Sequence, residues 1–178
     1  MLFAMLYNSS DAQDITLTNG VYEKKVVAQF EGVDLQTLYV RALEALSDWA
    51  GSAKNSSINI DVKDKEEGLV VYKGKLYMGY RRVNVSGWNT FANFTLKIKC
   101  KDGKSQLSVN VPSLTFIWVA RPDVIETIPM TSLVPYTHKT KTAVKKTAIE
   151  YTQKVPEVFD LIIQSLIDRM KNADDDDF

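Results

Sequence analysis

The chain has very few of the side chains that carry most enzyme chemistry. Its 178 residues include one cysteine, Cys100, and one histidine, His138. A single thiol excludes an internal disulfide and a cysteine-rich metal site. No acid or nucleophile motif surrounds His138, so we expect it to be exposed to solvent. The sequence also lacks the nucleophile elbow, the Walker A and dinucleotide-binding glycine motifs and the HExxH zinc motif. We therefore expect no enzyme activity, no cofactor and no metal.

The chain also lacks a net charge and a long hydrophobic run. The 22 Lys and Arg residues balance 22 Asp and Glu residues, so no global field attracts nucleic acid or anionic lipid. The apolar start, Met1–Tyr7, is far shorter than the roughly 20 residues of a membrane-spanning helix. With 45% hydrophobic and 25% charged residues, the composition is that of an ordinary globular domain. We expect one domain over residues 13–172.

The first residues are interpreted as the remnant of a secretory signal. Ser10 and Ala12 are small residues spaced as in the A-x-A-like site of a signal peptidase, after an apolar run. The mature chain would then begin near Gln13, without a transmembrane segment, and the protein would be secreted or periplasmic. A frayed N-terminus or a first strand is the alternative for Met1–Ala12. At the other end, residues 173–178 hold four consecutive aspartates and predict a solvated acidic tail.

The strongest pattern is a hairpin from Asn89 to Trp118. Asp102-Gly103 is a residue pair that favours a tight hairpin turn. Strict alternation on both sides of this turn predicts strands with one dry and one wet face. The dry face of the first strand holds Phe94, Leu96, Ile98 and Cys100, and its wet face holds Thr95, Lys97, Lys99 and Lys101. On the second strand Leu107, Val109 and Val111 form the dry face, and Leu114, Phe116 and Trp118 follow a proline. Cys100 is therefore expected to be a small buried hydrophobe rather than a reactive thiol.

The first half of the chain predicts a strand, a helix and two further strands. A strand at 21–30 is followed by a helix that Asp34 caps, with an apolar stripe from Leu35 to Trp49 and Gly51 as its left-handed C-cap. Ile58, Ile60 and Val62 alternate as the next strand. The third strand spans 69–80, with Val70, Tyr72, Leu76, Met78 and Tyr80 on one face and Lys73, Lys75 and Tyr77 opposite. Gly74 and Gly79 inside it predict a bulge or a close backbone approach. Ser86-Gly87 is expected to turn the chain into the hairpin.

The second half predicts an irregular stretch and then helix. Residues 120–139 contain three prolines and have three interpretations, as a wrapping arm, a short added strand at 124–128, or a functional loop. A helical pattern follows at 140–154, and Pro156 starts or kinks the final helix. The fold class is therefore α+β, with element order β-α-β-β-β-β-α and an antiparallel sheet of about five strands. Both main helices are expected on one face of this sheet.

Several segments together resemble a known family. They are FEGVDLQTLYVRALEALSDWAG, IDVKDKEEGLVVYKGKL, FTLKIKCKDGKSQLSV and the C-terminal amphipathic helix. Leu38, Tyr39, Ala42 and Trp49 stand at the helix positions of this family, and Lys101-Asp102-Gly103-Lys104 at its turn. The chain, from Val21 to Lys171, resembles a family of unknown function with a TATA-binding-protein-like (TBP-like) fold, common in secreted Bacteroidetes proteins. The resemblance implies an exported α+β domain and transfers no catalytic residue.

Two clusters of charged residues are candidates for function. Asp61, Asp64, Glu66 and Glu67 alternate with lysines, which is typical of a soluble turn rather than of a catalytic carboxylate pair. The second cluster lies on the expected helix-free face of the sheet and is the candidate binding surface, formed by Lys73, Lys75, Tyr77, Thr95, Lys97 and Lys99. Alternating lysines also simply keep such a face soluble.

The leading hypothesis is an exported, non-enzymatic module that binds an unknown protein or small molecule. Its surface would be the helix-free face together with the segment Arg121–Lys139. The alternative is a nucleic-acid-binding domain that uses the same lysines, because basic and aromatic side chains together suit nucleic acid. The neutral net charge and the expected export disfavour it. The weakest hypothesis is an enzyme with an unrecognised site near His138.

Overall fold

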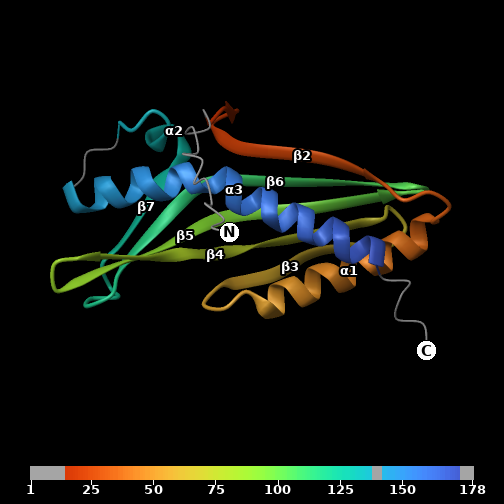
Figure 1. Ribbon diagram of the computed structural model, residues 1–178, viewed down its shortest axis with the longest axis horizontal. Helices are drawn as coiled ribbons and strands as arrows, with labels where there is room; N and C mark the ends of the chain where they lie inside the picture. Colours follow the sequence, from red (N-terminus) through yellow and green to blue (C-terminus); the bar gives the residue numbers. More distant parts are fainter. Residues whose placement is uncertain (1–14, 138–141, 173–178) are drawn as a thin grey trace, which may run out of the picture.

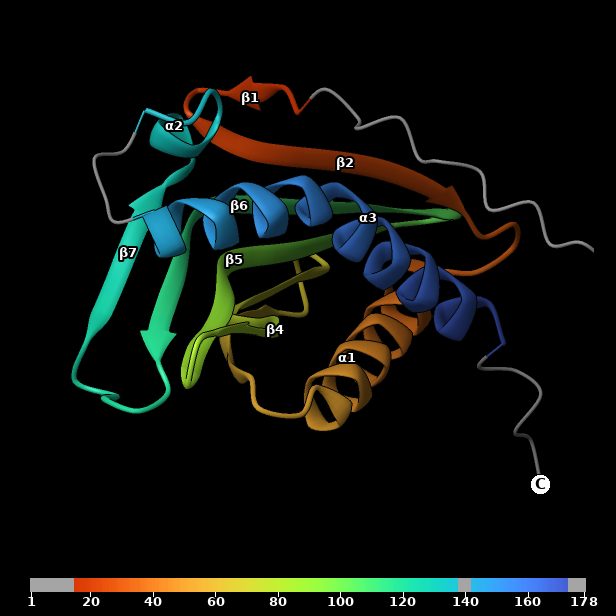
Figure 2. The ribbon, with the colours of Figure 1, turned by 60° about the vertical axis from the view of Figure 1, so that its left-hand side comes forward.

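A computed structural model describes residues 15–137 and 142–172. They form one seven-stranded antiparallel sheet in the order β1-β2-β6-β5-β4-β3, with β7 also beside β6. Figures 1 and 2 show both long helices on the same side of this sheet. The elements are β1 (Leu17–Thr18), β2 (Val21–Gln29), α1 (Leu35–Ser52), β3 (Ser57–Asp64), β4 (Leu69–Val83), β5 (Ser86–Lys101), β6 (Lys104–Trp118), β7 (Ile125–Pro129), α2 (Met130–Leu133) and α3 (Thr142–Asn172).

The α+β class, the order of the main elements and the one-sided helices are confirmed. The strand count is not, because the sheet has seven strands. The additional strands are β1, with two residues, and β7, with five. Segments this short carry too few side chains for alternation to appear in the sequence. Of the three interpretations of residues 120–139, β7 agrees with the short added strand.

The β5–β6 hairpin is confirmed as the centre of the sheet. Lys101 pairs with Lys104 across the turn, and Gly103 has a φ of 72°, which glycine adopts without steric cost. The face toward the helices is dry: Leu96, Ile98, Cys100, Leu107 and Val109 are fully buried. This face and the apolar sides of α1 and α3 form the core.

Helix α1 begins as the sequence predicts and ends differently. The Asp34 carboxylate accepts a hydrogen bond from the Thr37 amide at 2.9 Å. Gly51 is not the left-handed C-cap; it lies within the helix, which continues to Ser52. The Ser52 hydroxyl and the Ala53 amide both donate to the Trp49 carbonyl, so the helix end is satisfied without a left-handed residue.

Helix α3 is one continuous helix of 31 residues with Pro156 inside it. Proline lacks the amide that would bond the preceding turn, so it bends a helix. Figure 2 shows α3 changing direction along its length, toward α1. The sequence left two interpretations of Pro156 open, and the structure agrees with a bend.

Two strand predictions are wrong in detail, and both errors arise at irregular positions. The turn between β4 and β5 is Asn84-Val85 rather than Ser86-Gly87, because Ser86 pairs with Val83 and Asn84 has a φ of 57°. In β3 the register shifts between Ile60 and Val62, so the expected alternation breaks at Asp61. None of the helices in the described residues is long and apolar enough to cross a membrane.

Candidate binding face of the sheet

The sheet face away from the helices, here called the outer face, gathers all six predicted surface residues. Residues directly opposed in an antiparallel pair point to the same side of the sheet. The register sets Lys73 opposite Thr95, Val71 opposite Lys97 and Leu69 opposite Lys99. By alternation, the same face also carries the remaining two predicted residues, Lys75 and Tyr77. The lysines of β4 and of β5 therefore form one surface rather than two.

Ion pairs neutralise part of the basic charge on the outer face. Lys73 Nζ lies 2.8 Å from Asp61 Oδ2, and Lys99 Nζ lies 3.5 Å from Glu67 Oε2. Two members of the acidic cluster, Asp61 and Glu67, thus form ion pairs with these lysines. Within the β3–β4 turn, the Asp64 carboxylate accepts a hydrogen bond from the Glu67 amide at 3.0 Å. These roles agree with a soluble turn rather than with a catalytic pair.

Two lysines in the middle of the outer face keep their charge unpaired within the described part of the chain. They are Lys75 and Lys97, whose ammonium groups have no carboxylate within 4.0 Å there, and both are exposed. They lie on neighbouring strands, on either side of the Lys73–Thr95 pair. Lys101 and Lys104, opposite each other at the turn of the β5–β6 hairpin, lie on the same face, are exposed and also have no ion pair within the described residues. The unpaired positive charge of the outer face therefore lies at Lys75 and Lys97 in its middle and at this turn.

Aromatic side chains lie beside Lys75. The rings of Tyr77 and Phe91 are paired across β4 and β5, with centroids 5.5 Å apart. Tyr80 lies on the same face, 45% exposed, with its ring over Gly87. The sequence predicted Tyr80 on the opposite face, and this is wrong because a bulge between Tyr77 and Gly79 reverses the alternation. Gly79 inside the strand was the signal for that reversal.

A row of polar side chains crosses the outer face from β5 to β7. The Asn93 amide donates to Ser113 Oγ at 2.8 Å and to Thr115 Oγ1 at 2.9 Å. Thr115 and Thr127 share a hydrogen bond at 3.0 Å. This row fixes side-chain positions next to the aromatic pair, so the outer face is ordered locally rather than uniformly solvated.

Cys100 has no place in this site. Its side chain is fully buried, and Ser105 Oγ donates to its sulfur at 3.4 Å. Burial raises the pKa of the thiol, which disfavours the reactive thiolate. The prediction of a small buried hydrophobe is confirmed.

The remaining candidates of the sequence contribute little to the site. Of the segment Arg121–Lys139, the described part is largely structural: β7 pairs with β6, and Arg121 pairs with Asp123 at 3.1 Å. His138, Met1–Ala12 and residues 173–178 lie outside the described residues. Within the described ranges, no group of three or more His, Cys, Asp or Glu side chains is arranged to hold a metal ion.

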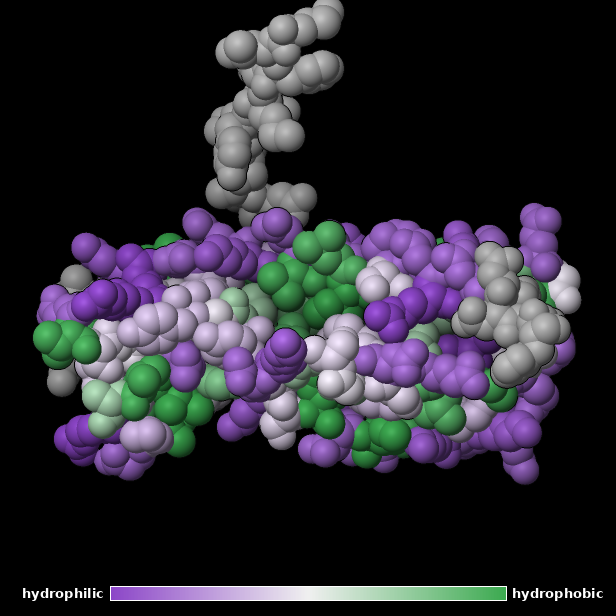
Figure 3. Space-filling view, turned by 60° about the horizontal axis from the view of Figure 1, so that its bottom comes forward, coloured by the Kyte–Doolittle hydropathy of each residue, from purple (hydrophilic) through white to green (hydrophobic). Residues whose placement is uncertain are grey.

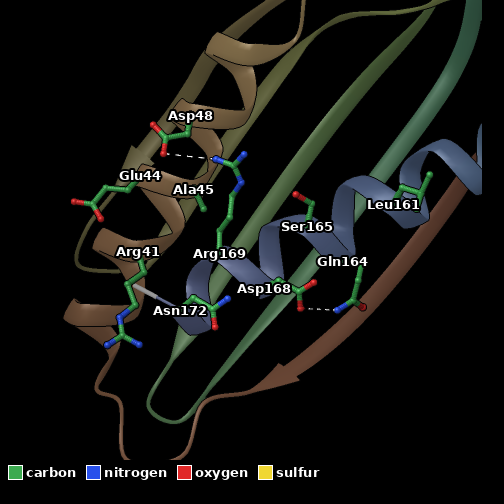
Figure 4. Close-up of a pocket in the computed structure, with 10 residues that line it drawn as sticks. All are labelled: Arg41, Glu44, Ala45, Asp48, Leu161, Gln164, Ser165, Asp168, Arg169 and Asn172. Atoms are coloured by element: carbon green, nitrogen blue, oxygen red, sulfur yellow. Dashed lines mark hydrogen bonds and ion pairs between the residues drawn. The ribbon is translucent and has the colours of Figure 1, made fainter. Parts of the chain in front are cut away.

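One hollow was not predicted, a groove of about 670 Å³ between α1 and the end of α3. Figure 4 shows acidic and basic side chains along it, with Asp48 facing Arg169 at 3.6 Å and Gln164 bonded to Asp168 at 2.8 Å. Arg41 Nη1 donates to the Met170 carbonyl at 3.4 Å, near the C-terminal end of α3, where a cation is favoured. The contacts of Asp48 with Arg169 and of Arg41 with Met170 join α1 to α3, whereas Gln164 and Asp168 both lie on α3, so we interpret the groove as a polar junction between the two helices.

Comparison with known proteins places this architecture in a family. The model of DUF4468, a domain of unknown function with a TBP-like fold, matches residues 22–114. A crystal structure of a DUF4468 protein from Bacteroides ovatus has a TM-score of 0.60 and 13% identity, over 87% of this chain and 91% of that one. A TBP-like protein from Parabacteroides distasonis has a TM-score of 0.58 and 11% identity, over 86% of this chain and 97% of that one. No curated protein matches. Both structures support the fold, and the family model covers more than half of the sequence; the chain belongs to the DUF4468 family of domains of unknown function with a TBP-like fold.

Proposed function

We propose that the chain is a non-enzymatic binding module of the cell envelope and that its ligand binds on the outer face of the sheet. The observation that carries the proposal is that three features share a face that no described helix covers: unpaired Lys75, the Tyr77–Phe91 pair beside it, and unpaired Lys97 further along the sheet, opposite Val71. A basic group beside an aromatic surface suits a ligand with an anionic group next to an apolar or planar one.

The polar row from Asn93 to Thr127 supports the same surface. A face that only kept the protein soluble would not need side chains held in place by mutual hydrogen bonds. Fixed donors and acceptors next to cations lower the entropic cost of ordering a ligand. The partner is therefore a protein or a small molecule with this mixed chemistry.

The direct test is native mass spectrometry of the protein purified from its own cell envelope. We expect a co-purifying ligand on the wild-type chain that is lost from Lys97→Glu, because the charge reversal repels the anionic group. Lys171→Glu makes the same charge change at the end of α3 and should retain the ligand. A chain that carries no ligand, or a ligand that survives Lys97→Glu, contradicts the proposal.

Nucleic-acid binding is the alternative, and the neighbouring lysines and aromatic rings favour it. The ion pairs of Lys73 and Lys99 count against it, since a phosphate-binding surface needs free cations. Filter binding of oligonucleotides at varied salt separates the two ideas. We expect no measurable affinity at low salt; an affinity that falls steeply as salt rises would favour nucleic acid instead.

Location in the cell envelope is part of the proposal and is tested separately. If Met1–Ala12 belongs to a secretory signal, mass spectrometry of the native protein should find an N-terminus near Gln13. The protein should then fractionate with the cell envelope. Cytoplasmic protein that keeps Met1–Ala12 would contradict export and would leave the ligand proposal to its own test.

A further inference from the structure

On the side away from β5, strand β4 is paired with another strand along only part of its length. It pairs with β5 from Leu69 to Val83, whereas β3 borders it from Leu69 to Lys75. Strand β6, on the other side of the hairpin, is bordered by two strands in line, β2 as far as Val111 and β7 from Ser113. In the described part of the chain no strand pairs with residues 76–83 on the side away from β5. This stretch is here called the β4 edge.

The backbone of the β4 edge is open to a further strand. The Tyr77 amide points away from β5 and donates to Ser56 Oγ at 3.0 Å. No other backbone bond joins residues 78–83 to a neighbour on that side, within the described residues. Beyond the bulge at Gly79 the edge continues for the five residues 79–83, the length of β7. Unpaired strand edges are templates for extended peptides.

The surroundings of the β4 edge are strongly basic. Glu150, on α3, bonds to both Arg81 and Lys154 and neutralises part of this charge. Figure 3 brings the side with α1 and β3 toward the viewer and shows mostly hydrophilic side chains, with hydrophobic ones in separate patches. Lys75, Arg81 and Arg82 lie on β4 itself, and Lys154 is joined to Arg81 through Glu150. Lys54 and Lys146 lie nearby in the fold, because their carbonyls accept hydrogen bonds from Ser56 and Arg81.

We propose that the β4 edge binds an extended acidic segment of a partner protein, which joins the sheet as an added strand in line with β3. The regularly spaced amides and carbonyls of the edge match a peptide backbone, whereas a nucleic acid supplies no row of donors for the carbonyls. A second copy of the chain fits poorly, because two basic edges would repel each other. This surface adjoins the outer face and shares Lys75 and Tyr77 with it, so its test uses Arg82, which the proposed function does not use.

The competing interpretation is that the bulge and the arginines protect the edge from pairing. Fluorescence anisotropy with a labelled peptide of alternating glutamate and valine, at low salt, distinguishes the two. We expect saturable binding that weakens about tenfold or more in Arg82→Glu, since a repulsive charge is placed on the edge. Lys101→Glu makes the same change at the far end of the sheet and should bind like the wild type.

Two further measurements test strand addition itself. The same peptide methylated on alternate backbone amides should not bind, because it cannot complete the strand hydrogen bonds. Hydrogen exchange should show that the bound peptide protects amides within residues 79–83. Absence of binding, equal binding of the methylated peptide, equal loss in Lys101→Glu or protection elsewhere would each overturn the proposal. The proposal would also be overturned if an oligothymidine bound more tightly than the peptide, or if the protein formed a dimer that Arg82→Glu disrupts.

Discussion

At the scale of single residues, the N-cap Asp34 makes the stability of the fold depend on pH. Hydrogen bonds from the Thr37 amide and hydroxyl lower the pKa of its carboxyl. The charged form is therefore favoured in the folded state, and its contribution to stability is present above the unfolded pKa and is lost as pH falls through the folded one. Asparagine caps a helix about as well without titrating.

We therefore predict that Asp34→Asn lessens the loss of stability on acidification. Below about pH 4 the wild type should lose stability faster than the variant, whereas near neutral pH the two should be similar. Chemical denaturation at several pH values measures both slopes. Equal slopes would contradict a lower pKa of Asp34 in the folded state than in the unfolded chain.

Substitution of two glycines by alanine should change the stability of the fold in opposite directions. Gly79 has a φ of 140°, and a Cβ there would lie 2.6 Å from Tyr151 Oη. Gly51 lies within α1, with nothing within 4 Å of an added Cβ. We predict that Gly79→Ala destabilises the fold by about 1–3 kcal/mol. Gly51→Ala should stabilise it by about 0.5–1 kcal/mol. Thermal and chemical unfolding of both variants would show whether the signs differ.

At the scale of elements, α3 contributes to the core a largely aliphatic buried side that also includes the rings of Tyr151 and Phe159. The Phe159 ring is fully buried and lies 5.7 Å, centroid to centroid, from Phe94 on β5. Leu161 lies two residues further along the same helix and is 65% exposed. Replacing each side chain by alanine therefore distinguishes the effect of core packing from that of helix propensity.

We predict that Phe159→Ala lowers the free energy of unfolding by about 3–5 kcal/mol, because it leaves a cavity between α3 and the sheet. Leu161→Ala should change it by less than about 0.5 kcal/mol. Urea unfolding followed by circular dichroism measures both values. Similar effects of the two substitutions would show that Phe159 does not anchor α3 to the sheet.

At the scale of the whole molecule, the sequence predicts regular elements well and irregular positions poorly. Alternation around Asp102-Gly103 and the stripe of α1 indicated the central hairpin and its covering helix. The side on which Tyr80 lies depends on one bulge, and the ion pairs Lys73–Asp61 and Lys99–Glu67 depend on strand register. Local composition determines neither the bulge nor the strand register. The common face of the six surface residues was therefore predictable, whereas the ion pairs that neutralise part of their charge were not.

The register of β2 has a consequence for how the chain folds. The strands from β3 to β6 follow one another as hairpins, but Tyr22 on β2 pairs with Val111 on β6. Closing this long loop costs chain entropy before any contact compensates for it, so pairing of β2 should follow the meander in time. Pulse-labelling hydrogen exchange during refolding should protect β5 amides before β2 amides. Until β2 pairs with it, the side of β6 that faces away from β5 is an exposed strand edge. The folding chain is therefore most prone to aggregation in this interval.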